Sequence, residues 1–132
     1  MKIFKNKFCE MELTEDNLLQ VVWFPTTATM KDNDLMTQQL LQKDTVIQNN
    51  VKKVLIDGRN QLFTITPELQ ERIGREALQP AIEAGLQKVA IILPTDIFAM
   101  VSIEQTMGEG GAQGFETCYF ENEITALAWL NC

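Results

Sequence analysis

Two short apolar runs constrain what this chain can fold into. They extend from Lys53 to Asp57 (KVLID) and from Lys88 to Leu93 (KVAIIL). Uninterrupted apolar runs of this length are typical of strands buried on both faces, as in a parallel sheet. Between them, Thr66-Pro67-Glu68 is typical of a helix start, with Thr66 as the cap and Pro67 in the first turn. A strand, a helix and a strand in this order predict a right-handed crossover between parallel strands.

The rest of the chain continues this alternation. At the amino-terminal end, the runs Ile3 to Phe8 and Leu18 to Phe24 carry the β-branched and aromatic residues that suit strands. The acidic stretch Thr14 to Asn17 predicts a turn, so we expect these two runs to form a hairpin. The residues leave open whether Cys9 to Leu13 extends the first strand. Phe115 to Phe120 predicts the last strand.

Helical periodicity marks the segments between the strands. The segment from Asp32 to Gln48 has an apolar stripe at helical spacing that includes Ile47. We expect the next helix to run to Ala84, with a kink at Pro80 and a left-handed stop at Gly85. The remaining predicted helices are Ile97 to Met107 and Glu123 to Leu130.

The resulting order β-β-α-β-α-β-α-β-α predicts an α/β fold. We expect a mixed, mostly parallel sheet of about five strands with four helices, in which an N-terminal β-hairpin precedes βα repeats. Residues 1–132 fit a single domain, because domains usually contain roughly 100–150 residues.

Composition excludes several classes of function. The chain has no histidine, which excludes Ser-His and Cys-His relays and imidazole-based metal sites. A formal net charge of −7 argues against nucleic-acid binding through phosphate neutralisation. Cys9, Cys118 and Cys132 lack C-x-x-C spacing, so we expect reduced thiols and neither a metal nor a cofactor. Since no apolar run has the length of a signal peptide or a membrane span, the sequence predicts a soluble, cytoplasmic protein.

Three segments carry a family resemblance. Val54 to Asp57, Gly85 to Leu93 and Phe120 to Leu130, together with the order of elements, resemble the SpoIIAA-like or STAS-like family. More narrowly, the chain is similar to the small stand-alone bacterial STAS/SEC14-type proteins, over nearly its whole length. The best-known STAS domains are anti-sigma-factor antagonists. They bind a kinase-like partner and are switched by phosphorylation of a serine at the start of a helix.

By position, the resemblance places that serine at Thr66. The family's usual Asp-Ser-Ser-Gly stretch corresponds to Ile65-Thr66-Pro67-Glu68, so Ile65 replaces the aspartate and Pro67 stiffens the turn. The resemblance therefore implies that Thr66 is a possible phosphorylation site and ligand-binding position. The alternative is a helix N-cap with no further role.

Ligands of α/β sheets usually lie outside the carboxyl ends of the strands. Asp57 ends a predicted strand there, and the guanidinium group of Arg59 can donate two parallel hydrogen bonds. Both are therefore candidate ligand-binding residues. In the alternative interpretation, Asp57 and Arg59 only brace the loop, through amide hydrogen bonds and an ion pair. Glu104 is a further candidate, as a ligand contact or a general acid or base, because it falls within an apolar helical stripe. It could equally face water or pair with Arg59.

Trp129 lies on a final helix that is apolar nearly all round. Such a helix is buried or is covered by a partner. Trp129 is therefore either at a homodimer interface, where aromatic residues are enriched, or packed within its own chain.

Three functional hypotheses follow. The first is a non-enzymatic STAS-like regulatory or interaction module that binds a protein partner or a small ligand. The second is a carrier of an apolar or lipid-like small molecule, which the SEC14-type relatives suggest. The third is an enzyme that uses Asp57, Glu104 or a thiol.

Overall fold

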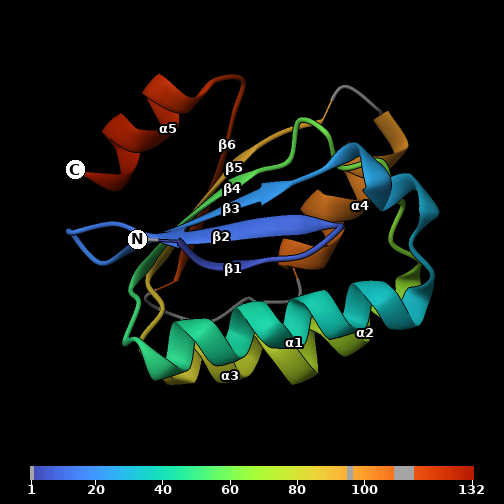
Figure 1. Ribbon diagram of the computed structural model, residues 1–132, viewed down its shortest axis with the longest axis horizontal. Helices are drawn as coiled ribbons and strands as arrows, with labels where there is room; N and C mark the ends of the chain where they lie inside the picture. The colour runs from blue at the N-terminus through green and yellow to red at the C-terminus, as the bar shows by residue number, and fades with distance from the viewer. Residues whose placement is uncertain (1, 95–96, 109–114) are drawn as a thin grey trace.

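A six-stranded sheet with the strand order β1-β2-β3-β4-β5-β6 forms the centre of the computed structural model (Figure 1). The structure describes residues 2–94, 97–108 and 115–132. β1, β2 and β3 pair antiparallel, whereas β3, β4, β5 and β6 pair in parallel. This mixed, mostly parallel sheet confirms the predicted α/β class. The strands are β1 (Lys2–Lys5), β2 (Cys9–Leu13), β3 (Leu18–Trp23), β4 (Lys53–Asp57), β5 (Lys88–Ile92) and β6 (Glu116–Phe120).

The amino-terminal hairpin differs from the prediction. The first strand stops at Lys5, because the side-chain oxygen of Asn6 accepts hydrogen bonds from the amides of Phe8 (2.8 Å) and Cys9 (3.0 Å) and turns the chain. The sheet therefore has six strands rather than the predicted five, and β2 pairs with both β1 and β3. The turn between β2 and β3 lies where the sequence predicts it, and Asn17 has a φ of 61° there.

Helices fill the connections between the parallel strands and follow the last strand. They are α1 (Asp32–Gln48), α2 (Pro67–Ile73), α3 (Gln79–Glu83), α4 (Ile97–Gly108) and α5 (Glu123–Leu130), with a short 3-10 turn at Pro25–Thr29. α2 and α3 are the two ends of one continuous helix, joined by a π-helical segment at Gly74–Leu78. The described residues thus contain the four helices that the sequence predicts, with α2 and α3 counted as one.

Pro80 explains the π-helical segment. Proline donates no hydrogen bond, and in an α-helix its ring clashes with the carbonyl four residues earlier. Here the amide of Gln79 donates to the carbonyl of Gly74 in a wider turn, which accommodates Pro80 where the sequence predicts a kink. The chain leaves this helix at Gly85 with a φ of 121°, as predicted.

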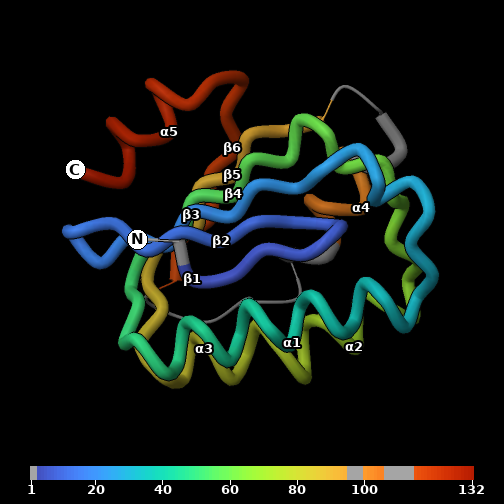
Figure 2. Tube along the Cα trace, in the orientation of Figure 1, coloured from blue at the N-terminus to red at the C-terminus, as the bar shows by residue number. Residues whose placement is uncertain are grey.

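The helices cover the two faces of the sheet unequally (Figure 1 and Figure 2). α1 and the α2–α3 helix lie side by side against one face, and α5 lies alone on the other. Right-handed crossovers that advance in one direction place their helices on the same face. The main core lies on the α1 side and includes Leu19, Trp23 and Ile91. A smaller core under α5 consists of Leu55, Ala90, Ile92, Ala126 and Leu130.

Candidate functional site

A cavity of about 90 Å³ lies within the main core, between the sheet and the helices α1, α2 and α3. Apolar side chains of β3, β4 and β5 form one wall, with Leu19, Val54 and Ile91 among them. Ile73 and Ala77 of the α2–α3 helix belong to the opposite wall. Protein interiors are close-packed and contain few voids larger than a water molecule, so this cavity is a candidate binding site.

Small side chains leave this space open. Ala77 lies in the π-helical segment and Ala81 lies one turn later, and both are buried and line the cavity. Leu78, also in the π-helical segment, contributes to the same wall. Because π-helical segments occur frequently at functional sites, the position of this one beside the cavity supports a binding role.

Polar side chains line the cavity on the α1 side. Gln39, Gln42 and Lys43 are spaced so that they share one face of α1. Gln42 is 8% exposed, and its side-chain nitrogen Nε2 has no hydrogen-bond partner among the described residues. Leaving a buried donor unpaired costs about 1–3 kcal/mol. The Nζ atom of Lys43, in contrast, lies 2.9 Å from the carboxylate of Asp44. Gln42 therefore places a buried, unpaired donor at the cavity wall.

The buried face of α1 includes Leu35, Met36 and Val46 of the predicted apolar stripe, but not Ile47. Ile47 is 38% exposed, whereas Gln38, Gln42 and Thr45 are buried. Gln38 shows how a buried glutamine is usually satisfied, since its Oε1 accepts a hydrogen bond of 2.7 Å from Asn6. The sequence predicts the stripe from apolar residues alone, whereas the buried face of α1 also contains the glutamine amides of Gln38 and Gln42.

Asp57 and Arg59 bind each other at the end of β4. Arg59 donates through Nε (3.0 Å) and Nη2 (2.7 Å) to the two carboxylate oxygens, and its backbone amide donates to the same group at 3.1 Å. Burial by itself would raise the pKa of Asp57, but the hydrogen bonds and charge of Arg59 outweigh it and lower the pKa. The arrangement is the loop-bracing alternative, and a ligand role for the pair stays a prediction.

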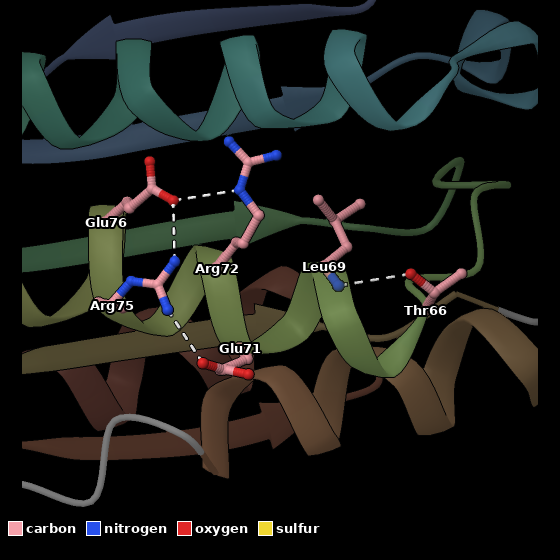
Figure 3. Close-up of polar contacts among 6 residues, drawn as sticks. All are labelled: Thr66, Leu69, Glu71, Arg72, Arg75 and Glu76. Atoms are coloured by element: carbon pink, nitrogen blue, oxygen red, sulfur yellow. Dashed lines mark hydrogen bonds and ion pairs between the residues drawn. The ribbon is translucent and has the colours of Figure 1, made fainter.

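Thr66 caps the helix that follows β4. Its hydroxyl oxygen accepts a hydrogen bond of 3.4 Å from the amide of Leu69 (Figure 3). The Thr66 side chain is exposed. The following turns of the same helix carry surface ion pairs, including Arg75 with Glu71 at 2.9 Å. The N-cap is thus present as the sequence predicts. Phosphorylation of Thr66 stays a prediction.

Glu104 does not lie on a buried apolar face. The residue is exposed, Val101 is 43% exposed, and the buried side of α4 includes Ser102 and Ile103. Glu104 thus faces water, which is one of the alternatives that the sequence left open, and a ligand or acid–base role for it stays a prediction. Burial, with a smaller contribution from the Glu104 charge, raises the pKa of Tyr119.

Trp129 packs against its own chain. Its ring lies 5.8 Å from that of Phe120 at an angle of 46°, and the Nζ atom of Lys88 lies 5.0 Å from the Trp129 ring centroid. The most exposed large apolar residue of α5 is Ile124, at 81%. A homodimer interface at Trp129 stays a prediction.

The four predicted ligand-binding residues do not line the cavity, as far as the described residues define it, although direct neighbours of three of them do. Asp57, Thr66 and Glu104 each follow directly after an isoleucine of the cavity wall. These isoleucines are Ile56, Ile65 and Ile103. On β4, adjacent side chains point to opposite faces, which explains why Ile56 lines the cavity and Asp57 does not.

The three cysteine thiols are also candidate reactive groups from the sequence. Cys9, Cys118 and Cys132 are free, and burial raises the pKa of Cys9 to about 11. Over residues 2–94, 97–108 and 115–132, no group of three or more Cys, Asp or Glu side chains is placed to hold a metal ion. In the same ranges, no helix combines the length and apolar character needed to cross a bilayer.

The chain matches no protein-family model and no curated protein.

Proposed function

We propose that the chain is a non-enzymatic binding module whose ligand is a small, largely apolar molecule held in the cavity beside α1. The observation that carries this proposal is a mostly apolar cavity of about 90 Å³ between the sheet and the helices α1, α2 and α3. An apolar cavity of about 150 Å³ is sufficient to bind benzene. The ligand is therefore either a molecule of about the size of benzene or less, or the end of a longer apolar chain.

The proposal includes membership of the STAS-like class and a place in the cytoplasm. The mixed sheet with its N-terminal hairpin and following βα units supports the resemblance of the chain to that class. Three free cysteines fit a reducing compartment. A binding role for the module is also what the STAS-like resemblance implies.

A binding role has more support than an enzymatic one. Of the two carboxylates proposed for catalysis, Asp57 is bound by Arg59 and Glu104 is exposed. The polar residues that line the cavity are Gln39, Gln42 and Lys43 of α1, together with Gln61 from the loop after β4. Amides recognise a ligand by hydrogen bonding but do not exchange protons near neutral pH.

Native mass spectrometry of protein purified gently from cells tests the proposal. We expect wild-type protein to carry an additional small mass. In Ala77→Leu the added side-chain atoms occupy part of the cavity, so this mass is lost, while a thermal melt confirms that the variant is folded. Ala84→Leu is the matched control, because it adds the same atoms at an exposed position just beyond α3.

Two results would contradict the proposal. One is the repeated absence of any retained molecule from wild-type protein, combined with no binding of small apolar probes. The other is a ligand retained equally by wild type and by folded Ala77→Leu, since that ligand would lie elsewhere.

A further inference from the structure

We propose that Gln42 selects the ligand by donating a hydrogen bond from Nε2 to a neutral acceptor oxygen, so that the ligand is a small apolar molecule with a carbonyl group. This inference rests on the function proposed above. It assigns the acceptor end of the ligand to the α1 wall and its apolar end to the wall that Ala77 and Ala81 form.

Gln42 Nε2 is one of two buried polar side-chain atoms without a hydrogen-bond partner among the described residues, and the other is Oγ1 of Thr117 on β6. Gln70 is also buried, yet its Nε2 donates to the carbonyl of Ile65 at 2.9 Å and to Oε1 of Gln105 at 3.0 Å. Gln42 is buried to the same degree and has an unpaired Nε2 among the described residues. Since nine-tenths or more of buried polar groups have a partner, an unpaired one at a cavity wall points to a partner that enters the cavity.

A water molecule satisfies this amide poorly. Buried waters typically form about three hydrogen bonds, and the walls across the cavity from α1 are made of side chains such as Val54, Ile73 and Ile91. A water bound to Gln42 would therefore find no partner on these walls and would depend on Gln39, Lys43 or Gln61, which also line the cavity. A ligand with one acceptor and an apolar remainder matches both kinds of wall.

The charge pattern favours a neutral acceptor over a carboxylate. A carboxylate requires several donors to offset the loss of its hydration. The nearest cation of this wall, Lys43, already has a partner in Asp44 at 2.9 Å. One amide donor suits a ketone, an aldehyde or an ester, each of which presents a single strong acceptor.

Titrations with two probes of matched shape test the inference. The probes are cyclopentanone and methylenecyclopentane. In methylenecyclopentane a methylene group stands in place of the carbonyl oxygen of cyclopentanone, so it cannot accept a hydrogen bond there. Binding is measured from amide and methyl chemical shifts in NMR spectra of wild type, Gln42→Met and Gln42→Leu. The control is Gln48→Met, which removes an exposed amide from the same helix.

We expect Gln42→Met and Gln42→Leu to weaken cyclopentanone binding about three- to tenfold, the range of one neutral hydrogen bond. Binding of methylenecyclopentane should be unchanged or stronger. Gln48→Met should match wild type for both probes, and cyclopentanone should shift the side-chain amide signal of Gln42 in the wild-type protein.

The outcomes separate the inference from the proposed function. If both probes bind wild type and the Gln42 variants change both affinities equally or not at all, the inference is wrong and the binding module stands. If neither probe binds folded wild-type protein, both are wrong.

Discussion

Arg59 holds both carboxylate oxygens of Asp57, with Nε 3.0 Å from one and Nη2 2.7 Å from the other. This pair braces the loop that follows β4, at the carboxyl end of that strand. Its strength is measurable through the pH dependence of stability. The pair therefore provides a test of the loop-bracing interpretation.

We predict that Asp57→Asn lowers the free energy of unfolding at pH 7 by about 0.5–1 kcal/mol, the upper range for partly exposed ion pairs. The folded-state pKa of Asp57 is lowered from its ordinary value of 3.8. The stabilisation is therefore fully present above that value and is lost as pH falls through the folded pKa. Urea denaturation of both proteins from pH 7 to pH 2.5 measures the difference.

An unchanged difference across this range would contradict the ion-pair account. Binding of the cavity probes should be the same in Asp57→Asn as in wild type, because Asp57 is outside the cavity wall. Weaker probe binding in this variant would instead favour the ligand role predicted for Asp57.

For Thr66, we predict that substitution by alanine destabilises the protein by about 0.5–1 kcal/mol. The reason is the loss of the hydroxyl oxygen that accepts from the amide of Leu69. Thr66→Ser keeps this oxygen and should stay within a few tenths of a kcal/mol of wild type. Thermal and urea denaturation measure both variants. Equal stability of Thr66→Ala and Thr66→Ser would show that the cap contributes nothing.

Trp129 gives a prediction about packing and assembly. Trp129→Ala should destabilise the protein by about 2–3 kcal/mol, because it removes the ring that contacts Phe120 and Lys88. Ile124→Ala, on the same helix but at an exposed position, should change stability by less than about 0.5 kcal/mol. Sedimentation velocity supplies the second readout. A dimeric wild type that becomes monomeric in Trp129→Ala would place Trp129 at a homodimer interface.

Much of this fold could be predicted because its signals are local. The apolar run from Lys53 to Asp57 forms a strand with those bounds. Thr66 and Gly85 mark the two ends of a helix through side-chain capping and a positive φ, which depend on a few neighbouring residues. The parallel pairing then follows from the order of the elements.

The errors arise where hydrogen bonding and backbone geometry are not visible in the apolar pattern. Asn6 breaks the first strand by bonding two amides, and Pro80 is accommodated in a π-helical turn that no periodicity indicates. Gln42 was missed because an amide on a buried helix face interrupts the apolar pattern that identifies such faces. The best available signal is the helical spacing of Gln42 from Leu35 and Val46, which are buried on the same helix.

The most direct measurement is a crystal structure of the wild-type protein soaked with cyclopentanone. The account predicts electron density for the ring in the cavity beside Ala77, with the ketone oxygen about 2.7–3.2 Å from Nε2 of Gln42. Density found only outside the cavity, or a ketone oxygen turned away from Gln42, would contradict it.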